Sequence, residues 1–128
     1  MVLIIGGAKQ GKLRYVLEKT GLREQNVVED IKSASTERIL YALQYAVREA
    51  LNTGVEPFSA LEKLLTQNPD VIIICDEVGG GIVPAHPDER ILRETVGRLC
   101  CMLAERATHV ERIFCSISMR LKGDDEWA

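Results

Sequence analysis

The sequence predicts an α/β fold, in which helices cover both faces of a mostly parallel β-sheet. A short apolar run at residues 2–5 ends in two glycines, and a continuous apolar run at residues 71–75 ends in two acids. Such uninterrupted runs are typical of parallel strands that are buried on both faces. The segments between them show the apolar spacing of helices, and alternating strands and helices indicate a parallel sheet. With 128 residues, the chain is predicted to form a single domain that spans residues 1–128.

The first half of the chain is predicted to alternate between strands and helices. Apolar residues at helical spacing follow the first strand, and Gly21 is a typical residue for ending the helix that they form. Val27 and Val28 indicate a weak second strand. A longer amphipathic pattern then predicts a helix packed on the sheet. The elements expected here are a strand at 2–5, a helix at 11–20, a strand at 27–28 and a helix at 36–52.

In the second half, Pro57 is suited to the first turn of a helix, and Asp88 is suited to cap a longer one. The last apolar run predicts a strand, and a short segment after it is expected at the edge of the sheet. The elements expected here are a helix at 57–65, a strand at 71–75, a helix at 88–107, a strand at 110–117, an edge segment at 119–122 and a loose tail at 123–128.

A glycine-rich loop joins the first strand to the first helix. Residues 6–12 fit the pattern G-x-x-x-x-G-K, which binds nucleotide phosphates when it lies between a strand and a helix. Backbone N–H groups and the start of the helix would face the phosphate oxygens, and Lys12 would reach the β- and γ-phosphates. The alternative is a tight turn kept for folding alone. The residues expected to contact nucleotide are Gly6, Gly7, Ala8, Lys9, Gln10, Gly11, Lys12 and Leu13.

This loop refines the predicted fold to a P-loop NTPase-like, three-layer arrangement, but Leu13 departs from the usual pattern. A P-loop places Ser or Thr directly after the lysine, and that hydroxyl binds Mg²⁺. Leu13 has no oxygen to offer. Either other groups hold Mg²⁺, or catalysis is weakened or lost.

Asp76 and Glu77 follow the apolar run at 71–75 and resemble a Walker-B element. Ligands bind beyond the carboxyl ends of parallel strands, so these acids are expected to meet the glycine-rich loop. Asp76 is the candidate Mg²⁺ ligand. The candidate catalytic residues are Glu77, which would act as a base, and Lys12. The alternative is an ordinary solvated strand end.

Composition excludes several classes of function. The net charge is −3 and no basic stripe stands out, so no nucleic-acid partner is expected. No apolar run approaches the about 18 residues of a membrane span. The N-terminus lacks the basic region of a signal peptide, so we expect a cytoplasmic protein without a membrane partner.

The four cysteines predict neither a zinc site nor a C-x-x-C motif, and the two histidines, His86 and His109, lack zinc spacing. Cys75 and Cys115 each fall in a predicted strand and are expected to be buried and reduced. The neighbouring Cys100 and Cys101 lie on a predicted helix, where they would point about 100° apart. They are therefore a poor joint metal site.

Four stretches resemble the adenosylcobinamide kinase/adenosylcobinamide-phosphate guanylyltransferase family. The segment 76–84, Asp-Glu-Val-Gly-Gly-Gly-Ile-Val-Pro, is similar to the family's Asn-Glu-Val-Gly-x-Gly-Ile-Val-Pro. The N-terminal Gly-Gly-Ala-Lys-Gln-Gly-Lys-Leu-Arg resembles its Gly-Gly-Ala-Arg-Ser-Gly-Lys-Ser-Arg. The helix with Arg90, Arg93, Gly97 and Arg98 resembles its Arg-x-Phe-Arg-Asp…Gly-Arg helix, and the final strand and its extension are also similar.

The resemblance implies a P-loop enzyme of cobalamin biosynthesis. Members phosphorylate the aminopropanol arm of adenosylcobinamide with a nucleoside triphosphate, and then transfer GMP from GTP through a guanylylated histidine. The implied ligands are GTP or ATP, with Mg²⁺ as the accompanying ion, and a cobinamide-type corrinoid. The resemblance also implies a homo-oligomer.

Functional positions of the family are changed in this chain. The family's histidine lies between the second strand and the next helices, whereas this chain has no histidine before His86 and is shortened in that region, after Asp30. We therefore expect guanylyltransferase activity to be absent. Ala85 replaces a common glutamate, and Cys100-Cys101 replaces Asn-Gln. The alternatives to a kinase-like enzyme are a non-catalytic nucleotide- or corrinoid-binding regulatory protein and a purely structural or assembly role.

Overall fold

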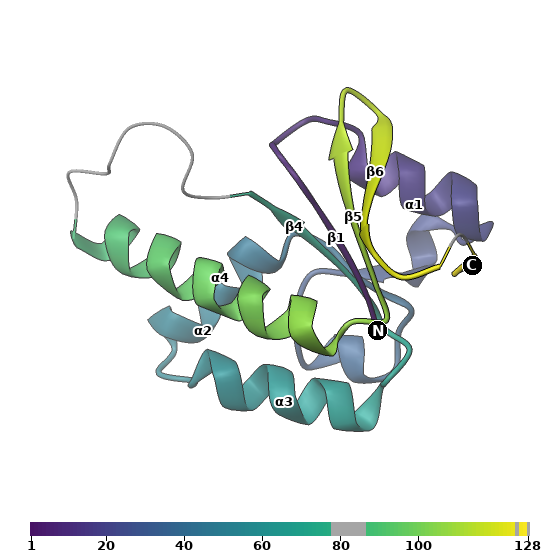
Figure 1. Ribbon diagram of the computed structural model, residues 1–128. Coiled ribbons are helices and arrows are strands. Elements are labelled where there is room, and N and C mark those ends of the chain that lie inside the picture. Colours follow the sequence, from purple (N-terminus) through teal and green to yellow (C-terminus); the bar gives the residue numbers. More distant parts are fainter. Residues whose placement is uncertain (78–86, 125, 128) are drawn as a thin grey trace.

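The computed structural model describes residues 1–77, 87–124, 126 and 127. Its centre is a six-stranded sheet with the order β2-β3-β4-β1-β5-β6, in which neighbouring strands run parallel except for the antiparallel last pair. This arrangement confirms the predicted α/β fold with a mostly parallel sheet (Figure 1). The strands are β1 Val2–Gly6, β2 Val27–Val28, β3 Ile39–Leu40, β4 Ile72–Asp76, β5 His109–Phe114 and β6 Ile117–Lys122.

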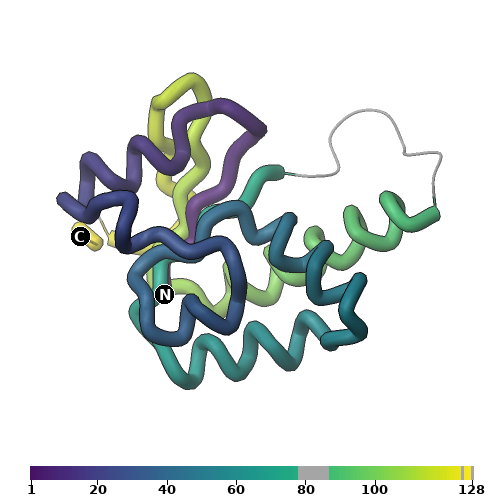
Figure 2. Tube along the Cα trace, turned by 180° about the vertical axis from the view of Figure 1, so that it is seen from behind, coloured from purple at the N-terminus to yellow at the C-terminus, as the bar shows by residue number. Residues whose placement is uncertain are grey.

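Helices cover the two faces of this sheet unequally. Helix α1 lies on one face, whereas α2, α3 and α4 lie together on the other (Figure 1). The connection from α1 to α2 contains β2 and β3, which form one edge of the sheet, and its winding course can be followed in the view from behind (Figure 2). The helices are α1 Lys12–Thr20, α2 Leu43–Asn52, α3 Pro57–Gln67 and α4 Pro87–Arg106, with short 3-10 turns at Glu24–Asn26 and Ser33–Ser35.

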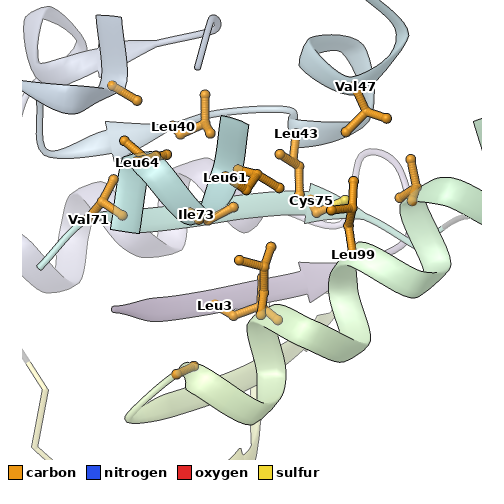
Figure 3. Packing of buried hydrophobic residues seen from close by; sticks show 14 of the residues in the cluster. Leu3, Leu40, Leu43, Val47, Leu61, Leu64, Val71, Ile73, Cys75 and Leu99 are labelled. Atoms are coloured by element: carbon orange, nitrogen blue, oxygen red, sulfur yellow. The ribbon is translucent and has the colours of Figure 1, made fainter. Parts of the chain in front are cut away.

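The core is divided by the sheet because successive strand residues point to opposite faces. Leu3 and Ile73 belong to the larger cluster, under α2, α3 and α4. Figure 3 shows this cluster, in which Leu61 and Leu64 from α3 and Leu99 from α4 pack over β4. Ile4 and Ile74 belong to the smaller cluster, with Val16 of α1. The predicted strands at 2–5 and 71–75 are thus the two central strands of the sheet.

One predicted helix is wrong in its first part. Residues 36–52 were expected to form one helix, but Ile39–Leu40 is strand β3, which pairs in parallel with β2 and β4. Ala42 has a φ of 58°, so the backbone turns before α2 starts at Leu43. Both strand residues are fully buried, and burial on both faces is what gives a parallel strand its apolar character.

The single strand expected at 110–117 is a hairpin. Strand β5 ends at Phe114, Cys115 and Ser116 form the turn, and the chain returns antiparallel as β6. Both turn residues have positive φ, 50° and 63°, which is the backbone of a tight two-residue hairpin turn. The expected edge segment at 119–122 is therefore part of β6. Cys115 is exposed rather than buried, whereas Cys75 is buried as predicted.

Two smaller expectations at element ends also change. Helix α4 begins at Pro87, so Asp88 lies in its first turn instead of capping it. The tail was expected to be loose, but Trp127 packs against the smaller core cluster and its Nε1 donates a hydrogen bond to Glu111. Lys19 of α1 lies over the indole ring, 5.3 Å from its centroid. Helix α1, with Gly21 at its end, and the start of α3 at Pro57 match the predictions.

Within the part of the chain that the structure describes, no helix has the length and apolar character needed to cross a membrane.

Candidate functional site

The loop after β1 and the acids after β4 meet at one edge of the sheet. Gly6 is paired with Asp76 in the parallel register of these strands, and the backbone N–H of Glu77 donates to the Gly6 carbonyl at 2.8 Å. Both strands therefore end side by side, as the carboxyl ends of parallel neighbours do. The structure brings the two predicted motifs together.

Lys12 occupies the centre of this edge. Its side chain is only 4% exposed, and its Nζ donates to the Gly7 carbonyl at 2.6 Å and lies 2.6 Å from Oδ1 of Asp76. A buried ammonium group is costly without such partners. The loop and the acid thus hold the positive charge of Lys12 at the start of α1, where the helix dipole adds positive potential.

The loop has a shape that side chains would disturb. A Cβ on Gly6 would lie 2.4 Å from the carbonyl oxygen of Ile113 in β5, so only glycine lets the loop leave the sheet here. Gly11 has a φ of 91°, and a Cβ there would lie 2.7 Å from Oγ of Ser116. Lys9 also has positive φ, 59°. Such conformations are typical of a loop whose backbone approaches a ligand.

A contact that the sequence did not predict holds this loop against the β5–β6 turn. The backbone N–H of Ser116 donates to the Gln10 carbonyl at 2.9 Å, and the N–H of Cys115 donates to Oε1 of Gln10 at 2.7 Å. The loop and the turn lie at the same end of the sheet in Figure 1. Gln10 is thereby fixed from both its backbone and its side chain, and the loop is held against the turn.

Leu13 takes part in core packing instead of presenting a polar group. Its side chain is half-buried and packs against the smaller apolar cluster that α1 covers. The first turn of α1 contains no acidic residue either. Leu13, which stands where a P-loop has Ser or Thr, therefore offers no side-chain oxygen at the glycine-rich loop.

Glu77 does not share the environment of Asp76. Its carboxylate forms a two-point ion pair with Arg112 of β5, with Nε–Oε1 at 2.7 Å and Nη2–Oε2 at 3.1 Å. This hydrogen-bonded carboxylate raises the pKa of the Arg112 guanidinium, which stays charged. Arg112 and Gln44, whose Oε1 accepts the backbone N–H of Asp76 at 3.1 Å, are site residues that the sequence did not indicate.

The described residues supply little for a metal ion on their own. Among them, no group of three or more His, Cys, Asp or Glu side chains is placed to hold a metal. Asp76 is nevertheless partly exposed at the loop, with its carboxylate beside Lys12. A P-loop Mg²⁺ takes most of its ligands from phosphate and water. One carboxylate at this position therefore fits such an ion, although a hydroxyl at position 13 is missing.

Most of the family-like segment that follows Glu77 is outside the described part of the chain. Val78, the glycines at 79–81, the Ile-Val-Pro segment at 82–84, Ala85 and His86 lie outside the residues that the structure describes.

A central parallel strand that leads through a glycine-rich loop into a helix, with a buried lysine facing an acid of the adjacent strand, defines a P-loop NTPase-like α/β protein. A family model agrees with this class and matches residues 12–121. The chain belongs to the CobU family, described as cobinamide kinase / cobinamide phosphate guanyltransferase. No individual curated protein gives a significant match. Because the matched region starts at Lys12, the loop at residues 6–11 is assigned from its sequence pattern and its geometry.

Proposed function

We propose that this chain binds a nucleoside triphosphate, GTP or ATP, at the loop formed by residues 6–12, and that it keeps a kinase-like activity. The observation that supports this most strongly is Lys12, which is buried between the Gly7 carbonyl and Asp76 at the start of α1. A lysine in this place neutralises the negative charge of β- and γ-phosphates. The proposed nucleotide contacts are Gly6, Gly7, Ala8, Lys9, Gln10, Gly11, Lys12 and Leu13.

The loop would act by positioning and charge. Its backbone N–H groups and the N-terminus of α1 would donate to phosphate oxygens, and Lys12 would stabilise the charge that develops during phosphoryl transfer. Asp76 would hold Mg²⁺, which supplies charge neutralisation between the β- and γ-phosphate oxygens. The ammonium of Lys12 and the metal would then share this carboxylate, whose Oδ1 lies 2.6 Å from Lys12 Nζ.

The proposed phosphoryl acceptor is a hydroxyl of a cobinamide-type corrinoid, because that is the substrate implied by the family description. Glu77 is the proposed base for this hydroxyl. Its carboxylate is paired with Arg112, and both side chains are more than a third exposed, 35% and 41%. Water screens such an exposed pair, so separating it costs little. Glu77 can therefore leave Arg112 when a substrate binds.

We propose that the guanylyl-transfer half of the family's chemistry is absent. Residues 1–85 contain no histidine. His109 starts β5 beside Val2, whereas Lys12 lies beyond the opposite end of β1. At about 3.3 Å per strand residue, His109 is too far away to attack a nucleotide held at Lys12. Incubation with GTP should therefore give no covalent GMP adduct by intact-mass spectrometry, and an adduct on any residue would contradict this.

The second candidate function is a non-catalytic nucleotide- or corrinoid-binding protein with a regulatory or assembly role. Leu13 favours it, since a P-loop without its hydroxyl binds the catalytic ion less well. A phosphoryl-transfer assay decides between the two. Purified protein is incubated with cobinamide, Mg²⁺ and ATP or GTP, beside Lys12→Ala. Formation of cobinamide phosphate that Lys12→Ala abolishes supports the enzyme, whereas tight nucleotide binding without product supports the binding protein.

We also propose that the chain forms a homo-oligomer. The outer hairpin exposes Phe114, Ile117 and Leu121, each more than half exposed. Apolar side chains gathered at a sheet edge are typical of an interaction surface. Light scattering at several protein concentrations should give a mass above that of one chain, and a monomer at high concentration would refute the proposal.

A further inference from the structure

Two cysteines lie in contact directly behind the proposed site. Cys75 is the residue before Asp76 in β4 and is fully buried. Figure 3 shows it within the larger apolar cluster, near Leu43 and Leu99. Cys100 of α4 reaches it from the next layer, with 3.8 Å between the two Sγ atoms. Both thiols are free. A disulfide needs about 2.05 Å, so the sulfurs must approach each other by less than 2 Å to bond.

The two thiols differ in accessibility. Cys75 is inaccessible, with no exposed surface. Cys100 is only partly buried. The Cys100 thiol donates to the Cys75 sulfur, and the Cys75 thiol donates in turn to the Asp76 carbonyl. One sulfur thus belongs to a partly exposed residue and the other is sheltered beside it, which is the arrangement of an attacking and a resolving cysteine.

We propose that Cys75 and Cys100 are a site of reversible oxidation, at which a peroxide or a low-molecular-weight disulfide converts the two thiols into an intramolecular disulfide. With hydrogen peroxide, the Cys100 thiolate displaces hydroxide and becomes a sulfenic acid. The Cys75 sulfur then bonds to the Cys100 sulfur and releases water. In total, two thiols are oxidised by two electrons, and one peroxide is reduced to two waters. With a small disulfide, two small thiols leave instead.

The disulfide would link β4 to α4 one residue before Asp76. Oxidation must draw the Cys75 sulfur away from the Asp76 carbonyl, which it now meets at 3.3 Å. Asp76 is also held by Gln44 and by Lys12, so a shift of this residue reaches the lysine. This consequence rests on the proposed function. We expect oxidation to weaken nucleotide binding by about fivefold or more, at the lower end of typical coupling between sites.

The chain contains matched controls for this chemistry. Cys101 is the next residue on α4 and is exposed, and Cys115 is exposed in the β5–β6 turn. If oxidation followed exposure alone, these two cysteines would react and would give links between chains. If it follows the geometry, the link joins Cys75 to Cys100 within one chain.

The test is a peptide map of the full chain after treatment with hydrogen peroxide or glutathione disulfide, digested without reductant. We expect a Cys75–Cys100 linked peptide that is lighter by two hydrogens than the sum of its parts and disappears on reduction. Cys101→Ser and Cys115→Ser should keep it, and Cys100→Ser should lose it. Because Cys100 is partly exposed, its serine variant should fold even if a change at Cys75 does not. Free Cys75 and Cys100 after oxidation of the other two cysteines would overturn the proposal.

A nucleotide titration of the oxidised and reduced protein separates formation of the disulfide from its effect on nucleotide binding. Equal affinity of both forms would refute the coupling to Asp76 while the peptide map still decides on the disulfide. Absence of nucleotide binding in both forms would refute the proposed function and leave the map unaffected.

Discussion

Replacing Gly11 by alanine tests whether the loop depends on its contact with the β5–β6 turn. Gly11 has a φ of 91°, in which an alanine is strained by about 1–2 kcal/mol. The new Cβ would also lie 2.7 Å from Oγ of Ser116. Moving that hydroxyl out of its rotamer adds about 1 kcal/mol. We therefore expect Gly11→Ala to lower the free energy of unfolding by about 2–3 kcal/mol, and nucleotide affinity by about fivefold or more.

Gly21→Ala is the matched control. Gly21 also has positive φ, 73°, but a Cβ there would meet nothing within 4 Å. This change should therefore cost only the backbone strain of about 1–2 kcal/mol and leave nucleotide binding unaltered. Urea unfolding of both variants, and of Gly11→Ala combined with Ser116→Ala, measures the difference. Removal of the Ser116 hydroxyl should recover the additional loss. Equal losses in the two glycine variants, with no recovery, would refute the account of the loop.

Three further outcomes follow from the contacts described above. In a double-mutant cycle of Arg112→Ala and Glu77→Gln, the losses in stability measured by urea unfolding should nearly add, because the pair is exposed. A clear departure from additivity would contradict this. Glu111→Ala should cost about 1–3 kcal/mol and shift the fluorescence of Trp127 to the red, because it leaves the partly buried donors of Tyr15, Ser118 and Trp127 without their acceptor. An unchanged emission spectrum would show that the indole does not dock on this carboxylate. Glu56 caps α3, and the backbone N–H of Ser59 lowers the pKa of the Glu56 carboxyl. The stabilisation by this cap is therefore present above the ordinary pKa of a glutamate and is lost as the pH falls through the lowered pKa. The difference in melting temperature between wild type and Glu56→Gln should shrink over that acid range, and a constant difference would contradict the assignment.

The part of the site that depends on strand order and motif could be predicted from the sequence. Parallel strands end at the same edge of a sheet, so an apolar run ending in glycines and another ending in acids were expected to converge. The pairing of Gly6 with Asp76 confirms this. The place of Lys12 at this edge could also be predicted, because the motif fixes the position of the lysine relative to the glycines of the loop.

Other features could not be predicted because they depend on tertiary context. The apolar positions Ile39, Leu40 and Leu43 fit a helix face as well as a buried strand followed by a helix, and periodicity alone does not separate the two. The turn at Cys115 and Ser116 lacks the glycine or asparagine that usually marks a tight hairpin. Its contact with Gln10 joins residues that are about a hundred positions apart in the chain, which no local pattern encodes.

The central claim is that Lys12 and its loop form a working nucleotide site. The most direct test is a calorimetric titration with GTP and with ATP, each with and without Mg²⁺, on wild type, Lys12→Ala and Lys63→Ala. Lys63 is an exposed lysine of α3 and serves as the control for removing one positive charge. We predict saturable binding by wild type and Lys63→Ala, weakened at least about tenfold in Lys12→Ala, which corresponds to about 1.4 kcal/mol. No binding by wild type, or equal binding by Lys12→Ala, would contradict the claim.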